Sequence, residues 1–139
     1  MAKANVLFLC TGNSARSQMA EALLRARAGD RFETYSAGLE PTEVNPLAIA
    51  AMSEIGIDIS AQRAKGIDEY LGRRHFGYLI TVCDHAAANC PMFPGVATRL
   101  HWSLVDPAAA EGSEEERLEV FRRVRDELAR LIEEFAATH

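Results

Sequence analysis

The sequence predicts an α/β fold in which a mainly parallel sheet is covered by helices on both faces. Short apolar runs typical of strands alternate along the chain with segments of helical spacing. The 139 residues, of which 48% are hydrophobic, are also enough to build one core without disulfide bonds. We therefore expect a single domain over residues 1–139, with ligands bound at the carboxyl ends of the strands.

Four apolar runs rich in Val, Ile, Leu, Phe and Tyr are short enough to form strands. The first run reads NVLFLC and the third reads FGYLITVC. Because Cys10 and Cys83 end these two runs, both are expected at the carboxyl edge of the sheet. The four runs cover residues 5–10, 32–36, 76–83 and 97–102.

Two helical segments occupy the first half of the chain between these runs. Residues 14–28 keep apolar side chains on one side, and Gly29 ends the segment. The second segment begins at Asn45 and Pro46, a capping residue followed by a proline in the first turn. It is expected to end near residue 56, where a glycine stands.

The second half of the chain contains a short helical stretch and one long one. Residues 67–71 fit a short helix. Ser113 and Glu116 have the spacing of a capping box, and the helix that they begin should run to about residue 135. No stretch between these elements is long enough to be a linker between two domains.

Composition and charge exclude several classes of function. The net charge of -5 argues against a protein that binds the phosphate backbone of nucleic acids, since such proteins need a basic face. We see no apolar run of membrane-spanning length and no secretory leader, so a cytoplasmic protein without membrane contact is expected. The three cysteines are an odd number, which favours thiol chemistry in a reducing compartment over a disulfide framework.

The stretch CTGNSARS joins the first strand to the first helix and carries the clearest chemical signal. A turn of this kind directs backbone N–H groups and the positive end of the helix dipole at one point, which favours a bound oxyanion and a cysteine thiolate. The Arg16 guanidinium can hold two oxygens of such an anion. A lone Cys10 would be interpreted as a small core residue, but its neighbours favour a reactive thiol. The residues expected to bind the oxyanion are Thr11, Gly12, Asn13, Ser14, Ala15, Arg16 and Ser17.

The same stretch resembles a known family. Residues 10–17 have the C-x5-R-S pattern of the low-molecular-weight protein tyrosine phosphatases, and CTGNSARSQMAEA is most similar to the thioredoxin-coupled arsenate reductases built on that fold. The segments YSAGLEP, VNPLAIAAM, GIDIS, ITVCDHAAANCP, HWSLVDPA and VFRRVRDEL extend the resemblance over nearly the whole chain. It implies a flavodoxin-like, three-layer sandwich with a four-stranded parallel sheet.

The resemblance places the family's general acid at Asp106, in the segment VDPA. A carboxylic acid beside the anion site can protonate a leaving group, whereas the sequence Asp-Pro by itself suggests only a turn. Phosphatases of this type usually carry an aromatic residue directly after Asp-Pro, and this chain has Ala108. That difference favours a small inorganic oxyanion over a phosphotyrosine.

The resemblance further implies that Cys83 and Cys90 supply the two electrons needed to reduce arsenate to arsenite. Cys10 would attack arsenate, Cys83 would attack Cys10, and a Cys83–Cys90 disulfide would remain for thioredoxin to reduce. Residues seven apart are about 10 Å apart along a helix, whereas a disulfide tolerates a Cα separation of about 7 Å at most. The segment DHAAANCP is therefore expected to fold back or unwind on oxidation, and Pro91 is expected to end any helix there.

Alternatives remain open at this point. A phosphatase acting on phosphotyrosine or small phosphoesters needs only Cys10, and a non-catalytic oxyanion or redox sensor needs no general acid. A zinc site formed by Cys83, His85, Cys90 and His101 lacks the paired ligand spacing of structural zinc sites. No metal or cofactor is therefore expected, and the chain is expected to be a monomer.

One further set of polar residues follows from the resemblance. Glu21, Ser36 and Asn13 match positions that lie near a potassium site in some of the reductases. The acidic residue expected in the segment AQRAKG is instead Lys65, whose ammonium could take the place of the cation. Potassium dependence is therefore not expected, and an exposed Lys65 without a role is the alternative.

Overall fold

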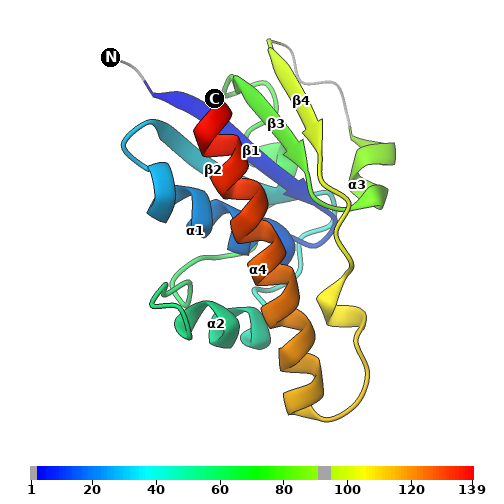
Figure 1. The fold of residues 1–139 in the computed structure, drawn as a ribbon. Coiled ribbons are helices and arrows are strands. Elements are labelled where there is room, and N and C mark those ends of the chain that lie inside the picture. The colour runs from blue at the N-terminus through cyan, green and yellow to red at the C-terminus, as the bar shows by residue number, and fades with distance from the viewer. Residues whose placement is uncertain (1–2, 91–94) are drawn as a thin grey trace.

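The computed structural model describes residues 3–90 and 95–139 and contains one four-stranded sheet (Figure 1). The strand order is β2-β1-β3-β4, and every pair of neighbours is parallel. The strands are β1 Ala4–Cys10, β2 Phe32–Gly38, β3 Tyr78–Thr81 and β4 Thr98–His101, and the helices are α1 Arg16–Ala28, α2 Pro46–Ser53, α3 Asp84–Asn89 and α4 Glu114–Thr138. Two 3₁₀ turns complete the described elements, η1 Ile67–Glu69 and η2 Pro107–Ala109.

Helical elements cover both faces of the sheet. Helices α1 and α4 lie together across one face, as Figure 1 shows, and Phe135 of α4 packs its ring on Phe32 of β2. On the opposite face Tyr35 of β2 packs edge-on against Tyr70, the residue that follows η1. The predicted fold class, a three-layer α/β sandwich around a four-stranded parallel sheet, is confirmed.

Strand β1 lies at the centre of the core. Residues 6–9 have no solvent-exposed surface, because β2 and β3 flank the strand and helical elements cover both faces. A strand buried on both faces is uniformly apolar rather than alternating, which is why the sequence reads VLFL. The strand ends at Cys10, directly before the loop that leads into α1.

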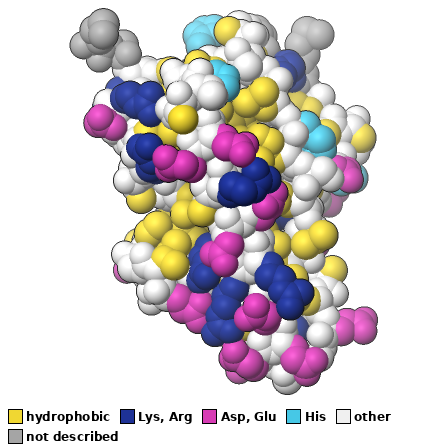
Figure 2. All heavy atoms as spheres, in the orientation of Figure 1, with side chains coloured by type: hydrophobic (Ala, Val, Ile, Leu, Met, Phe, Trp, Pro, Cys, Tyr) yellow, Lys and Arg dark blue, Asp and Glu magenta, His cyan; other side chains and the backbone are white. Residues whose placement is uncertain are grey.

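The predicted helix starts are present in the structure. The Asn45 side chain accepts a hydrogen bond from the Leu47 N–H at the start of α2. Ser113 and Glu116 form both hydrogen bonds of the capping box at the start of α4. Helix α4 then continues to Thr138, a few residues beyond the expected end, and Arg and Glu side chains alternate along its exposed surface (Figure 2).

The third strand and the segment after it differ from the sequence prediction. Strand β3 covers only Tyr78–Thr81 of the expected residues 76–83. The following residues form the short helix α3, which was not predicted as a helix, and Cys83 occupies its N-cap position. The alanines of DHAAAN favour a helix, and the Cys83 sulfur accepts a hydrogen bond from the Ala86 N–H in place of a conventional capping oxygen. The expected stop at Pro91 lies outside the described residues.

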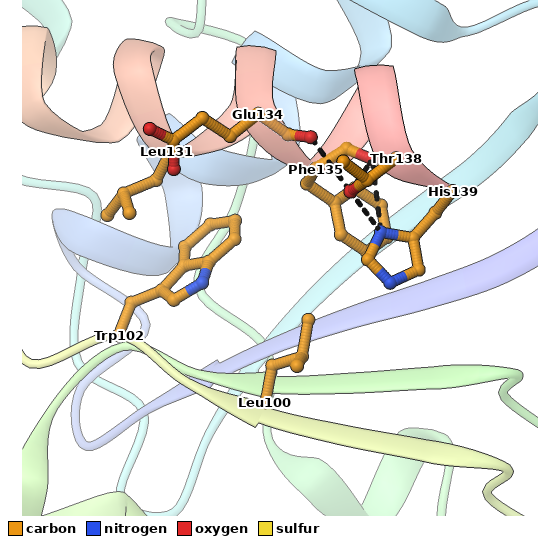
Figure 3. A pocket seen from close by; sticks show the side chains of 7 residues that line it. All are labelled: Leu100, Trp102, Leu131, Glu134, Phe135, Thr138 and His139. Carbon is orange, nitrogen blue, oxygen red and sulfur yellow. Dashed lines mark hydrogen bonds between the residues drawn. The ribbon is translucent and has the colours of Figure 1, made fainter.

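A hollow lies between β4 and the last turns of α4 (Figure 3). It has a volume of about 340 Å³, and Trp102 and Phe135 supply its aromatic walls. The predicted site residues are not among its lining residues, which are Leu100, Trp102, Leu131, Glu134, Phe135, Thr138 and His139. Among the helices described, none has both the length and the apolar character that crossing a bilayer requires.

Candidate active site

The Cys10 side chain is buried at the end of β1, where a backbone N–H and a hydroxyl contact its sulfur. The Asn13 N–H donates to the Cys10 Sγ at 3.1 Å, and the Ser17 Oγ lies 2.8 Å from the same sulfur. Asn13 has a φ of +50°, a left-handed conformation that asparagine tolerates better than most residues. The turn of the loop therefore directs a backbone donor at the sulfur.

The Asn13 side chain fixes the orientation of the Ser17 hydroxyl. The Asn13 Nδ2 donates to the Ser17 Oγ at 2.7 Å. Because this oxygen already accepts a hydrogen bond, its own hydrogen is available for the Cys10 sulfur. A backbone N–H and a hydroxyl therefore both contact the Cys10 sulfur from the protein side.

The loop encloses a cavity of about 240 Å³ next to Cys10. Arg16 and Asp106, which are far apart in the sequence, both reach this cavity. Asn13 and Ser17 are fully buried and contact the sulfur from the protein side instead. The residues that line the cavity are Cys10, Thr11, Gly12, Ser14, Ala15, Arg16, Thr42, Asp106 and Ala108.

Arg16 and Asp106 are held together at the mouth of the cavity. The Arg16 Nη1 donates to the Leu104 carbonyl at 3.0 Å, and its Nη2 lies 3.8 Å from the Asp106 Oδ1. The same Oδ1 accepts a hydrogen bond from the Ala108 N–H, so Asp106 also caps the turn η2. In this arrangement the Arg16 cation can bind the oxygens of an anion, and the Asp106 carboxyl group can donate a proton to a leaving group. The small side chain of Ala108 takes up little of the cavity.

Two residues that support the loop were missed in the sequence. Gly38 is paired with Cys10 in the sheet register, and a Cβ atom built on it would lie 2.6 Å from the Thr11 carbonyl oxygen and 2.8 Å from the Asn13 nitrogen. Thr42 lines the cavity, and its N–H donates to the Gly12 carbonyl at 3.0 Å. The parallel pairing of β1 with β2 places residues 38–42 beside the loop, and the sequence spacing alone does not reveal this.

The second cysteine lies at the end of the neighbouring strand, close to the loop. The Cys83 sulfur is buried and lies 3.4 Å from the Thr11 Oγ1. It also accepts the Ala86 N–H at 3.4 Å. The first two cysteines therefore stand near the carboxyl ends of adjacent parallel strands, and the hydroxyl of the residue after Cys10 contacts the Cys83 sulfur.

The third cysteine is at the opposite end of helix α3. Cys90 is the C-cap residue, half-buried, with the Arg99 Nη1 3.9 Å from its sulfur. Burial raises the pKa of the Cys90 thiol, and the nearby Arg99 opposes this shift. All three cysteines are free thiols, and the whole length of α3 separates Cys83 from Cys90.

The loop, the sheet order and the paired positions of Arg16 and Asp106 identify a family. A model of the low molecular weight phosphotyrosine protein phosphatases matches residues 5–138. The chain belongs to this family. Solved structures of this fold include arsenate reductases and a low molecular weight protein tyrosine phosphatase, so membership does not choose between the two reactions.

Individual members of the family narrow the comparison. An arsenate reductase of Halalkalibacterium halodurans is 51% identical over 138 residues, which is 99% of each chain. The solved structure of an arsenate reductase in the phosphate-binding state has a TM-score of 0.83 at 34% identity, over 96% of this chain and 97% of that one. A thioredoxin-dependent arsenate reductase of Corynebacterium glutamicum has a TM-score of 0.72 at 31% identity, over 99% of this chain and 64% of that one.

Behind the loop, a buried polar cluster surrounds the ammonium of Lys65. This group lies 3.7 Å from the Glu21 Oε1, and it donates to the Ser36 Oγ at 3.3 Å and the Arg63 carbonyl at 3.0 Å. Burial lowers the pKa of Lys65, and the attraction of Glu21 opposes this shift. The Lys65 N–H also donates to the Asn13 Oδ1, which connects the cluster to the loop. The alternative of an exposed Lys65 without a role is therefore wrong, because its ammonium contacts Glu21, Ser36 and the Arg63 carbonyl.

We expect replacement of Lys65 by methionine to destabilise the protein by about 1–3 kcal/mol, because the buried Glu21 carboxylate then loses one of the two cations, Lys65 and Arg25, that pair with it among the described residues. Urea denaturation measures this change. Lys3→Met is the matched control, since Lys3 forms an exposed pair with Glu33, and its effect should stay below about 0.5 kcal/mol.

The wild-type protein should also unfold at the same urea concentration in potassium chloride and in choline chloride of equal ionic strength. An unfolding midpoint that lies at a higher urea concentration in potassium chloride than in choline chloride would contradict the interpretation that the Lys65 ammonium takes the place of a bound potassium ion.

Within residues 3–90 and 95–139, no three His, Cys, Asp or Glu side chains are grouped closely enough to hold a metal ion.

Proposed function

We propose that the protein reduces arsenate to arsenite by a relay of three cysteines, and that thioredoxin regenerates the reduced enzyme. The arrangement of the thiols is the observation that carries this proposal. Cys10 lies over an oxyanion loop, Cys83 stands beside that loop at the end of the next strand, and Cys90 is one helix away. A phosphatase needs the first of these thiols only.

The first step is an attack of the Cys10 thiolate on the arsenic of bound arsenate. A sulfur–arsenic bond forms and a hydroxide leaves, and the Asp106 carboxyl group donates the proton that turns the hydroxide into water. The Arg16 guanidinium and the N–H groups of the loop bind the remaining oxygens. The proximity of Arg16 to Asp106, 3.8 Å, supports a shared role at one substrate.

The next step transfers two electrons to arsenic. The Cys83 thiolate attacks the Cys10 sulfur, a sulfur–sulfur bond forms, and the electron pair of the sulfur–arsenic bond remains on arsenic, which leaves as arsenite. Cys90 then attacks Cys83 and releases the Cys10 thiolate. The product is a Cys83–Cys90 disulfide, which two electrons from thioredoxin return to the dithiol.

The phosphatase alternative is less well supported. The position after Asp106 and Pro107 is Ala108, which lines the cavity and offers no aromatic surface for a phosphotyrosine ring. The cavity of about 240 Å³ suits a small tetrahedral anion. Phosphate is expected to bind there as well, since it has the same shape and charge as arsenate.

A coupled assay tests the proposal. With NADPH, thioredoxin and thioredoxin reductase present, the wild-type protein should consume NADPH only when arsenate is added, and Cys10→Ser should consume none because a serine hydroxyl is not ionised at neutral pH. Lack of arsenate-dependent consumption by the wild type, both with thioredoxin and with glutaredoxin and glutathione as the reductant, would refute the function. Consumption that is restored only by glutaredoxin and glutathione would retain arsenate reduction and replace thioredoxin as the reductant.

A further inference from the structure

Side chains of β4 and the residues after it contact helix α3 at both of its ends. Arg99, His101 and Ser103 alternate along the chain, and such residues point to one side of an extended segment. His101 and Ser103 contact the first residue of α3, and Arg99 lies beside the cysteine that follows its last residue. The edge of the sheet thus holds the segment that connects Cys83 to Cys90.

The contacts at the amino end of α3 converge on one carboxylate. The His101 Nε2 lies 2.8 Å from the Asp84 Oδ1, and the Ser103 Oγ donates to the same oxygen at 3.0 Å. These hydrogen bonds lower the pKa of Asp84. On the other side of the imidazole ring, the Thr81 Oγ1 lies 2.7 Å from the Nδ1. Because the Asp84 carboxylate oxygen can only accept, the His101 Nε2–H donates to it.

Formation of a Cys83–Cys90 disulfide is incompatible with this arrangement. The two cysteines flank the six residues of α3, and positions seven apart in a helix are separated by about 10 Å, against an upper limit of about 7 Å for a disulfide. The helix must therefore unwind when the disulfide forms. Asp84 follows Cys83 directly, so its contacts with His101 and Ser103 belong to the wound, dithiol form.

We propose that His101 is a positioning residue that acts through Asp84 to hold α3 wound, and that it thereby sets the reduction potential of the Cys83–Cys90 pair. This inference rests on the proposed relay. A contact present in the dithiol form and lost in the disulfide form stabilises the reduced state, which makes the disulfide a stronger oxidant and easier for a small dithiol protein to reduce. His101 does not line the cavity next to Cys10; it lines a separate hollow together with Cys90.

A redox titration of the whole protein in glutathione buffers tests the role of His101. In each buffer, oxidised glutathione takes up the two electrons of the Cys83 and Cys90 thiols, and mass spectrometry of the linked peptides counts the disulfide. We expect His101→Leu to shift the equilibrium constant toward the disulfide about fivefold. For a two-electron couple, this makes the reduction potential of the Cys83–Cys90 pair about 20 mV more negative. His101→Gln keeps a donor near the position of the Nε2 and should restore most of the wild-type potential.

Hydrogen exchange of the α3 amides in the reduced protein gives a second readout that needs no disulfide. Exchange should be about fivefold faster in His101→Leu than in the wild type, and close to wild type in His101→Gln. Arg27→Leu is the matched control, because it removes an exposed ion pair with Glu133 between α1 and α4, and it should change neither quantity. Ser103→Ala provides a milder variant with shifts in the same direction, should His101→Leu fold poorly.

The outcomes separate this inference from the proposed function. A wild-type protein that forms no Cys83–Cys90 disulfide at any glutathione ratio refutes the relay itself. A disulfide that forms in the wild type with the same potential in His101→Leu, or α3 exchange that is the same in both, overturns the role of His101 and leaves the relay standing.

Discussion

Cys90→Ser is expected to release a single equivalent of arsenite per chain and then to stop, even with thioredoxin present. The first two steps need only Cys10 and Cys83, so arsenite leaves once and a Cys10–Cys83 disulfide remains. Both sulfurs of that disulfide are buried in the reduced structure, 3% exposed in each residue, whereas Cys90 is half-buried. A protein reductant would have no accessible sulfur to attack.

A quenched single-turnover experiment measures this result as arsenite released per chain, with peptide mapping of the disulfide that accumulates. Cys83→Ser should release none, because its arsenic adduct on Cys10 cannot be resolved. Asn89→Ser is the matched control: it changes the neighbouring exposed residue of α3, retains all three thiols, and should turn over continuously. Continuous turnover by Cys90→Ser would rule out Cys90 as the resolving thiol.

Gly38→Ala should lower kcat/KM for arsenate by at least ~10²-fold, since displacement of a reacting group by about 1 Å has an effect of this size. A Cβ atom at this position would overlap the backbone of the loop, 2.6 Å from the Thr11 carbonyl oxygen. The backbone cannot rotate away as a flexible side chain could, so the loop must move and its donors lose their aim at Cys10. The same overlap should destabilise the fold by about 1–3 kcal/mol.

Gly77→Ala is the matched control for this substitution. A Cβ atom on Gly77 would meet the Asn5 carbonyl oxygen at 3.8 Å, an ordinary contact. Thermal unfolding and the coupled assay, performed on both variants, separate the loss of the loop from a general effect of alanine in place of glycine. Equal activity of Gly38→Ala and wild type would show that the loop tolerates the added atom.

Features encoded locally could be predicted from the sequence. The apolar run that ends at Cys10, the Asn45 cap and the capping box at Ser113 each follow from residues within a few positions of one another, and the structure contains all three. The fold class and the family follow from the same local signals together with the resemblance. Helix α4 extends three residues beyond the predicted end, and the first of these, Ala136, is buried.

Features that depend on neighbouring strands could not be predicted from spacing. Gly38 must lack a side chain because the register of β2 on β1 places it against the loop, and that register is not visible in either segment alone. Similarly, His101 and Asp84 are 17 residues apart and meet only because β4 lies beside β3. Helix α3 was missed because six residues are too few to show a helical period.

The ammonium of Lys65 is covalently attached to the chain, so the charge of Glu21 is balanced without a cation from solution. A cation from solution would occupy such a site according to its concentration, and its contribution to stability would rise and fall with that concentration. A covalently attached cation has a high and constant effective concentration at its partner. The backbone N–H of Lys65 donates to the Asn13 Oδ1, so the residue that carries this cation also contacts the loop beside Cys10.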